Sequence, residues 1–173
     1  MLKLCYPNLY VSSFRNVELD LLKQMNIKGL ILDIDNTLVA TSVETPDGDV
    51  VKWIEKMKYA GIKLCIVSNA SMKRVKIFND NMNIHSIHRA SKPSKKSFVK
   101  AANIMGLKNE QVAVIGDQIF CDILGGNITN MYTILVKPIS KREFWFVKLK
   151  RFPERIVLAS YRKTVSRKEI SEV

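Results

Sequence analysis

Two aspartates, Asp33 and Asp35, follow an apolar run directly in the segment KGLILDIDNTLV, which spans residues 28–39. A continuous apolar run that contains a β-branched residue is typical of a strand covered on both faces. Two carboxylates at the end of such a strand require a balancing charge, because an unpaired buried charge is costly. A divalent cation is the simplest partner. Taken alone, the DxDxT pattern is also compatible with an ordinary Asp/Asn turn.

Polar residues also follow the next three predicted strands. The segment KLCIVS ends in Ser68, the loop after a short strand at Ser86–His88 contains Lys92, and the segment QVAVI is followed by Asp117 after one glycine. Because the carboxyl ends of parallel strands meet at one edge of a sheet, we expect these residues to converge with the two aspartates. Taken one at a time, each of these residues is also compatible with an ordinary turn residue or a solvated charge. Together they supply the nucleophile, acid, hydroxyl, cation and Mg²⁺ ligands that phosphoryl transfer requires.

Helical segments alternate with these strands. Apolar spacing and capping residues predict four helices, over residues 16–25, from Pro46 to just before Gly61, from Ser71 to Met82 and over residues 95–105. Pro46 is expected at the first helical position, and a fifth strand is predicted over residues 132–136. The alternation predicts an α/β fold, with a doubly wound parallel sheet of about five strands and helices on both faces.

Composition limits the class of protein. The chain has 173 residues, of which 47% are hydrophobic, enough for one domain with a proper core and too few for two ordinary domains. Cys5, Cys65 and Cys121 form no CxxC pair, so we expect reduced core residues. No apolar stretch resembles a signal peptide or approaches the roughly 20 residues that span a bilayer. We therefore expect a cytoplasmic protein that is neither secreted nor transmembrane.

The charge of the chain is strongly basic and unevenly distributed. Its 28 Lys and Arg residues and 16 Asp and Glu residues give a net charge of +12. Residues 137–173 hold 11 of the basic residues and 4 of the acidic ones, so the excess is concentrated there. A basic surface attracts nucleic acid or anionic lipid, and charge alone does not choose between them. A solvated basic face without a partner is the simpler alternative.

The motifs at the strand ends resemble those of the haloacid dehalogenase (HAD) superfamily of Mg²⁺-dependent phosphatases. DIDNT resembles its first motif, Ser68 its second, Lys92 its third and GDQIFCD its fourth. The segments LDIDNTLV, IVSN, IHRASKP, VAVIGDQIFCDILGGN and YTILV are similar to the YqeG subfamily, which is related to mitochondrial phosphatidylglycerophosphate phosphatase. This resemblance covers Leu30 to Val136. After DNTLV the subfamily often has Trp or Pro, whereas this chain has ATSVETPDG, a difference at the rim of the expected site.

The resemblance implies a catalytic role for each residue at the strand ends. Asp33 would attack phosphorus and form an aspartyl phosphate. Asp35 would protonate the leaving oxygen and later deprotonate the attacking water. Ser68 and Asn69 would hold the phosphoryl oxygens, while Lys92 offsets their charge.

The resemblance also implies one cofactor, Mg²⁺. Its ligands would be Asp33, Asp117 and the backbone carbonyl of Asp35. Thr37 would brace the loop through its hydroxyl, and Asp122 would orient the motif-three lysine or a metal-bound water.

Motif spacing bears on the substrate. There are 34 residues between Asp33 and Ser68 and 23 between Ser68 and Lys92, so neither interval holds a cap domain. Enzymes that act on small metabolites often need a lid to exclude water. An open site instead suits a phosphate on something large, and the resemblance favours an anionic phospholipid such as phosphatidylglycerophosphate.

The C-terminal region is predicted to be distinct from the phosphatase domain. Residues 1–136 would form that domain, and residues 137–173 a basic amphipathic tail in which Pro153 starts a second segment. Interleaved aromatic and basic residues suit the inner face of an anionic membrane, to which the protein would bind peripherally. A C-terminal helix packed on the domain is the competing interpretation. The residues expected to contact a membrane are Trp145, Phe146, Lys148, Lys150 and Arg151.

Other functions stay open at this point. A phosphatase of a nucleotide, a phosphoprotein or a nucleic-acid end is compatible with an open, positively charged site. A non-catalytic HAD-fold binding module is disfavoured because both Asp33 and Asp35 are present. A receiver domain fits poorly, since its phosphorylated aspartate follows the third strand, where this chain has no Asp. Nothing resembles a nucleic-acid-binding fold, and no motif indicates an oligomeric state.

Overall fold

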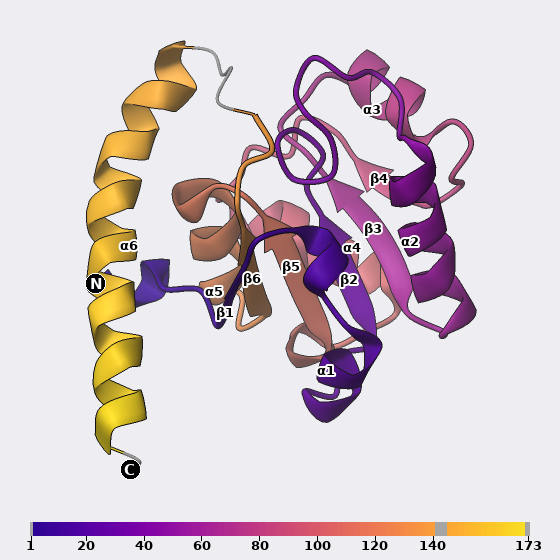
Figure 1. Cartoon of the computed structure of the whole chain (residues 1–173). Helices are drawn as coiled ribbons and strands as arrows, with labels where there is room; N and C mark the ends of the chain where they lie inside the picture. Colours follow the sequence, from indigo (N-terminus) through magenta and orange to yellow (C-terminus); the bar gives the residue numbers. More distant parts are fainter. Residues whose placement is uncertain (1, 141–144, 172–173) are drawn as a thin grey trace.

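The computed structural model describes the backbone of residues 2–140 and 145–171 and the side chains of residues 2–140 and 152–165. Within these residues six parallel strands form one sheet, in the order β1-β6-β5-β2-β3-β4 (Figure 1). The expected α/β fold with a parallel sheet is therefore confirmed. The strands are β1 (Leu9–Val11), β2 (Gly29–Leu32), β3 (Lys63–Val67), β4 (His85–Ile87), β5 (Val112–Gly116) and β6 (Tyr132–Val136).

Strand β1 is a sixth strand, in addition to the five that the sequence predicts. It has three residues, lies at the edge of the sheet and pairs with β6 alone. All three of its side chains are half-buried, so the sequence lacks the alternation or the long apolar run by which a strand is detected. Its place in the sheet depends on pairing with residues more than a hundred positions away, such as Leu9 with Ile134.

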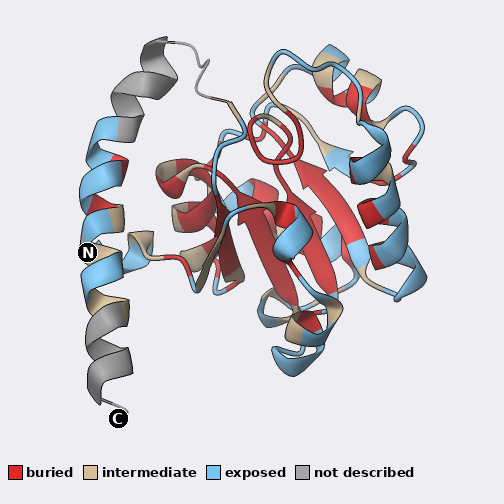
Figure 2. Cartoon of the chain, viewed as in Figure 1, coloured by how far each residue is buried: buried red, intermediate tan, exposed pale blue. Residues whose placement is uncertain are grey.

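Helices cover both faces of the sheet, whose central strands are buried (Figure 2). Side chains of α1, α2 and α3 pack on one face, and those of α4 pack on the other, where α5 lies against α4. The helices are α1 (Leu19–Gln24), α2 (Gly48–Tyr59), α3 (Met72–Asn79), α4 (Lys95–Met105), α5 (Leu124–Asn127) and α6 (Trp145–Ser171).

The start of α2 differs from its predicted position. The Asp47 carboxylate accepts a hydrogen bond from the Val50 N–H at 2.8 Å, so Asp47 caps the helix and Gly48 is its first residue. A side-chain acceptor at this position satisfies one of the N–H groups that a first turn leaves unpaired. Pro46 therefore precedes the helix, and the prediction that it occupies the first helical position is wrong.

The first predicted helix is shorter than expected. Asn16 closes a 3₁₀ turn, η2 (Phe14–Asn16), and the chain is extended at Val17 before α1 begins at Leu19. The Asn16 side chain accepts a hydrogen bond from the Ser12 hydroxyl at 2.9 Å instead of capping a helix. Polar side chains of this kind stabilise turns as readily as helix starts, which explains the misplaced boundary.

The sheet register brings the ends of three central strands to one edge. Leu32 at the end of β2 lies opposite Ile66 of β3 and Ile115 of β5. The residues that follow these strands therefore emerge next to one another, as expected for a doubly wound sheet. A π-helical turn, η4 (Ile119–Ile123), follows β5 and leads directly into α5.

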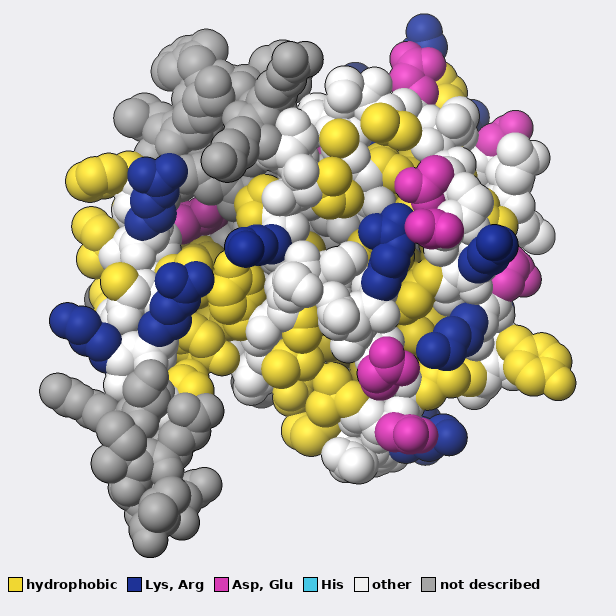
Figure 3. Space-filling model, in the orientation of Figure 1, with side chains coloured by type: hydrophobic (Ala, Val, Ile, Leu, Met, Phe, Trp, Pro, Cys, Tyr) yellow, Lys and Arg dark blue, Asp and Glu magenta, His cyan; other side chains and the backbone are white. Residues whose placement is uncertain are grey.

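The C-terminal helix α6 packs on the side of the sheet formed by β1 and β6. Between Glu154 and Tyr161 its inner face contacts the body, with Val157 buried against η4 and β6, and hydrophobic side chains fill the space between them (Figure 3). The Tyr6 hydroxyl lies 2.7 Å from the Ser160 hydroxyl. Pro153 lies inside α6, so the prediction that it starts a second segment is wrong.

Five residues predicted to touch a membrane lie on α6, but their side chains fall outside the described residues: Trp145, Phe146, Lys148, Lys150 and Arg151. Among the described residues, no helix combines the length and the apolar character needed to cross a bilayer.

Candidate active site

A buried lysine links two aspartates at the carboxyl edge of the sheet. Lys92 Nζ donates hydrogen bonds to Asp33 Oδ1 and Asp122 Oδ1, each at 2.6 Å. Asp33 follows β2, Lys92 follows β4 and Asp122 lies on η4, so three separate segments meet here. All three residues are buried. A buried charge is tolerated only when it is paired in this way.

The two carboxylates keep the lysine charged. Burial by itself would lower the pKa of Lys92, but the charges of Asp122 and Asp33 outweigh it and raise that pKa above its ordinary value. The Lys92 ammonium is therefore a fixed positive charge beside Asp33. Such a charge can stabilise the oxygens of a phosphoryl group that reaches Asp33.

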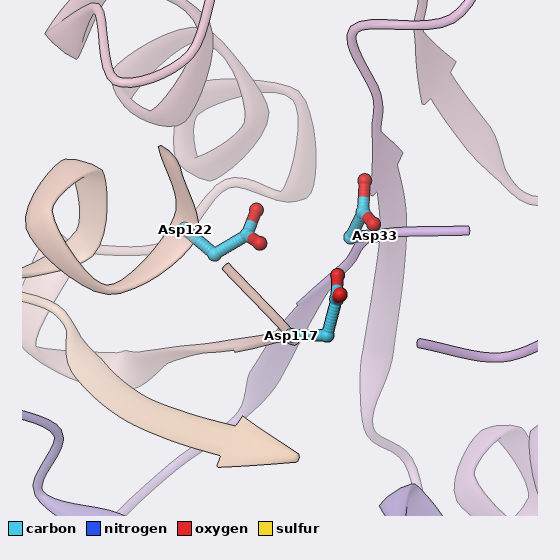
Figure 4. Close-up of side chains that lie close together, drawn as sticks. All are labelled: Asp33, Asp117 and Asp122. Atoms are coloured by element: carbon cyan, nitrogen blue, oxygen red, sulfur yellow. The ribbon is translucent and has the colours of Figure 1, made fainter. Parts of the chain in front are cut away.

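Thr37 joins the ends of β2 and β5. Its hydroxyl lies 3.3 Å from Asp33 Oδ2 and 3.2 Å from Asp117 Oδ1, and donates its single proton to one of them at a time. Oxygen atoms of Asp33, Asp117 and Asp122 all lie within 4.8 Å of one another, and the three carboxylates face the same space (Figure 4). Carboxylate oxygens are the ligands that Mg²⁺ prefers in proteins. Asp33 and Asp117 therefore fit a divalent cation, while Asp122 is paired with Lys92.

Asp122 is held by both of its oxygens. Besides Lys92 at Oδ1, its Oδ2 accepts a hydrogen bond from the Gln118 N–H at 3.1 Å. Gly116 makes this position possible, because a Cβ on Gly116 would overlap the Asp122 carboxylate. The glycine of the GDQIFCD segment therefore has a packing role that the motif alone does not reveal.

We expect Gly116→Ala to displace Asp122 and loosen Lys92. The overlap should lower the free energy of unfolding by about 1–3 kcal/mol, as overpacking in a core does, and should also lower turnover in the expected phosphatase reaction. Denaturant unfolding and steady-state kinetics measure the two effects. Gly48→Ala is the matched control, since a Cβ there would meet no atom within 4 Å. Equal behaviour of the two variants would contradict this account of Gly116.

Asp35 lies beside an arginine that sequence reasoning missed. Arg74, on α3, donates to Asp35 Oδ1 from Nη2 at 3.0 Å and from Nε at 3.3 Å. Burial raises the pKa of Asp35, the Arg74 hydrogen bond and charge oppose this, and the charge of Asp33 adds to it. The net direction is upward, toward the range in which a carboxyl group can both give and accept a proton.

A sequence signal for Arg74 existed. α3 begins directly after the strand that delivers Ser68, and the Ser71 hydroxyl caps it by accepting from the Arg74 N–H at 3.3 Å. The first turn of such a helix starts near the ligand-binding edge of a doubly wound sheet, so its charged residues are candidates, but the sequence does not show which of them reaches Asp35.

Ser68 and Asn69 follow β3 and shape the approach to Lys92. Ser68 is buried, and its hydroxyl oxygen accepts from the Ala70 N–H at 3.1 Å. Asn69 Oδ1 accepts from the Lys92 backbone N–H at 2.8 Å. The Asn69 side chain therefore holds the loop that carries Lys92, a contact that the sequence does not predict.

A buried glutamate of α6 holds the turn after Asp117. Glu154 Oε1 accepts from the Ile119 N–H at 2.8 Å and from the Phe120 N–H at 3.4 Å. These N–H groups begin η4, the turn that carries Asp122. The C-terminal helix thus supports the candidate site, although none of its described side chains belongs to the acidic cluster.

The charges at the site leave a negative excess. Counted as ionised, the carboxylates are Asp33, Asp35, Asp117 and Asp122, and the cations are Lys92 and Arg74. One divalent cation would neutralise this difference. The described donor set and its charge thus agree on a divalent metal ion.

A model of the family described as mitochondrial PGP phosphatase matches residues 2–140. The chain belongs to this family. It is 38% identical over 161 residues to the probable phosphatase YqeG of Bacillus subtilis, across 93% of this chain and 94% of that protein. It is 28% identical over 163 residues to the mitochondrial phosphatidylglycerophosphatase GEP4 of Saccharomyces cerevisiae, across 81% and 86% of the two chains. The predicted HAD-type phosphatase related to phosphatidylglycerophosphate phosphatases is therefore confirmed.

Solved structures agree with the fold of this family. An uncharacterised protein from Listeria monocytogenes matches with a TM-score of 0.54 and 19% identity, across 68% of this chain and 85% of that one. At this identity the match shows the fold alone. The chain is thus a phosphatase with a HAD-like α/β fold.

Proposed function

We propose that the protein hydrolyses a phosphomonoester through an aspartyl-phosphate intermediate on Asp33. The observation that carries this proposal is the position of Asp33, whose carboxylate is buried, hydrogen-bonded to Thr37 and paired with Lys92 at 2.6 Å. Lys92 would hold the phosphoryl oxygens while the Asp33 carboxylate attacks phosphorus. Ser68, at the end of the neighbouring strand, would hold another phosphoryl oxygen.

Asp35 would be the acid and then the base. Its Oδ1 is held by Arg74, so the proton that reaches the leaving oxygen would sit on Oδ2. The same oxygen would later accept a proton from the attacking water. The raised pKa of Asp35, which burial causes, supports this exchange of protonation states.

Mg²⁺ is the proposed cofactor, held by Asp33, Asp117 and the backbone carbonyl of Asp35. When bound, it would offset the negative charge of the phosphoryl group during transfer. Thr37 would keep the Asp33 and Asp117 carboxylates in place, and Asp122 would keep Lys92 in place, without either residue binding the metal.

The proposed substrate is phosphatidylglycerophosphate or a similar lipid phosphate. The name of the yeast relative supports this class of substrate. The short spacing between the motifs supports it as well, because the intervals hold α2, α3 and single strands but no cap domain. A site without a cap leaves room for a phosphate presented on a bilayer.

We test this substrate class by measuring phosphate release from phosphatidylglycerophosphate in mixed micelles and from a panel of soluble phosphates. We expect kcat/KM to be highest for the lipid, and hydrolysis to require Mg²⁺. Higher kcat/KM for a nucleotide, a phosphopeptide or a nucleic-acid end would replace the lipid with that substrate while leaving the phosphatase chemistry in place.

Helix α6 is the proposed membrane-facing element. Its inner face packs on the body, while Phe152 and Ile156 are 69% and 58% exposed on the helix and Arg155 is exposed between them. Hydrophobic and basic side chains gather on the outer side of this helix, at the left of Figure 3. The two interpretations of the tail are thus compatible, because different faces would serve packing and membrane contact. Apolar groups would set the depth of insertion and basic groups the attraction.

We expect the double variant Phe152→Ser/Ile156→Ser to bind anionic vesicles more weakly and to hydrolyse the lipid more slowly. Trp145→Ser/Phe146→Ser, or Lys148, Lys150 and Arg151 changed to Glu, should have the same effect. Each basic residue at an anionic surface contributes about 1 kcal/mol, and salt weakens this attraction because screening shortens to about 8 Å at physiological ionic strength. Vesicle co-sedimentation at several salt concentrations measures the binding.

The control for the tail variants is Tyr59→Ser, which removes a 98% exposed aromatic ring from α2. It should leave vesicle binding unchanged. Turnover of a small soluble phosphate should change little in the tail variants, because Asp33 and Lys92 lie at the sheet edge. Equal loss on soluble and lipid substrates would mean that α6 acts only as a packed structural helix.

A further inference from the structure

Arg74 is a nearly buried cation that the chemistry at Asp33 does not use. Its side chain is 16% exposed and contacts Asp35. It lies on α3, a different segment from those that carry Lys92, Asp33 and Asp122. It contacts Asp35 Oδ1 through Nε and Nη2, and its Nη1 donates to the Glu44 carbonyl oxygen at 2.6 Å. Glu44 belongs to the ATSVETPDG segment that follows DNTLV.

The Arg74 guanidinium has more N–H donors than its contacts use. Arginine carries five N–H groups, and the three hydrogen bonds to Asp35 and Glu44 use three of them. Among the residues whose side chains the structure describes, the Arg74 guanidinium has no further hydrogen-bond acceptor. The guanidinium carbon also lies 5.5 Å from the centre of the Phe78 ring. Two N–H groups on the terminal nitrogens therefore have no partner within this part of the protein. A forked pair of donors matches the oxygens of a phosphate group.

The position of Arg74 places this charge on the leaving-group side. Asp35, which Arg74 holds, is the residue that would protonate the leaving oxygen, whereas Lys92 serves the phosphoryl group at Asp33. A cation next to the acid is thus near the part of the substrate that departs.

We propose that Arg74 binds a second anionic group, a phosphodiester, carried by the leaving group, and so selects substrates in which a phosphodiester lies close to the phosphomonoester. This inference rests on the proposed lipid-phosphate function and names the residue that recognises the lipid headgroup. Arg74 has two roles in this account. It positions Asp35 through Oδ1, and it contacts the substrate through its remaining N–H groups.

The test compares two soluble substrates with the same kind of leaving oxygen. Glycerol 3-phosphate has a phosphomonoester on glycerol and no diester, whereas a short-chain phosphatidylglycerophosphate, used below its micelle concentration, has both. For each we measure kcat and KM with the full chain and Mg²⁺. Because both substrates need the acid, misplacing Asp35 should slow them equally, and the ratio of their kcat/KM values isolates the phosphodiester contact.

We expect the full chain to prefer the diester substrate and Arg74→Gln to reduce that preference about tenfold or more, mainly through a higher KM, as the loss of a charge-assisted bidentate contact implies. Arg74→Lys should restore part of it, because it keeps the charge and loses the fork. Lys73→Gln, which removes an exposed charge from the adjacent position of α3, should leave the ratio unchanged.

The possible outcomes distinguish the role of Arg74 from the lipid-phosphate function. A preference that survives in Arg74→Gln overturns the role of Arg74 and leaves the lipid-phosphate function standing. Failure of the unmodified protein to hydrolyse the diester substrate, while it hydrolyses other phosphomonoesters, overturns the lipid function and the Arg74 proposal with it. An equal fall for both substrates in Arg74→Gln also overturns phosphodiester recognition, since Arg74 would then act only by positioning Asp35.

Discussion

The Asp33→Asn variant should lose phosphomonoester hydrolysis by at least about a thousandfold, because a neutral amide cannot act as the nucleophile. The fold should persist, since Lys92 keeps Asp122 as a partner at 2.6 Å. Initial rates and circular dichroism measure the two properties. Asp20→Asn is the control, because the Asp20 side chain is 87% exposed on α1. A folded Asp33→Asn protein with near-normal turnover would rule out the aspartyl-phosphate mechanism.

Removing Lys92 should affect both stability and turnover. Lys92→Ala leaves the carboxylates of Asp33 and Asp122 buried without the ammonium that each now meets at 2.6 Å. Breaking a buried ion pair from one side costs about 3–5 kcal/mol, so the midpoint of urea unfolding should fall clearly. Lys23→Ala, at an exposed position of α1, should leave the midpoint nearly unchanged. A Lys92→Ala protein as stable as the unmodified one would contradict the pairing.

The response to Mg²⁺ should distinguish Lys92 from Asp117. Asp117→Asn weakens a proposed ligand, so part of the lost rate should return as Mg²⁺ is raised. In Lys92→Ala no added metal can replace the ammonium at the same place, and the loss should persist. Activity titrations over a wide range of Mg²⁺ compare the two variants. Identical titration curves would mean that the two roles are assigned wrongly.

Elements with a strong local pattern could be predicted from the sequence. The apolar stripe of α4 and its closing Gly106, which has a φ of 65°, match the prediction because helical spacing and the left-handed C-terminal glycine are local features. The boundaries of α1 and α2 could not be predicted, because the polar side chains of Asn16 and Asp47 can each stabilise either a turn or a helix start. The short strand β1 had too little pattern to detect.

The candidate site was predictable to a similar degree. Residues that follow predicted parallel strands converge because all strands end at one edge, and the sequence therefore predicts that Asp33, Lys92 and Asp117 lie together, as they do. Side chains that reach this edge from helices cannot be predicted in the same way. Arg74 arrives from α3, and the Glu154 contact with the start of η4 crosses 35 positions of the chain.

The sequence by itself determined the family of this protein and its candidate site residues: two aspartates, a lysine and a further aspartate that follow strands, in a family of phosphatases. Residue type and local periodicity carry that information. Only the tertiary structure decided which groups hold these residues in place. Three contacts depend on distances between segments that no local pattern encodes. They are the ion pair of Arg74 with Asp35, the close approach of Asp122 to Gly116 and the hydrogen bond by which Glu154 joins α6 to the start of η4.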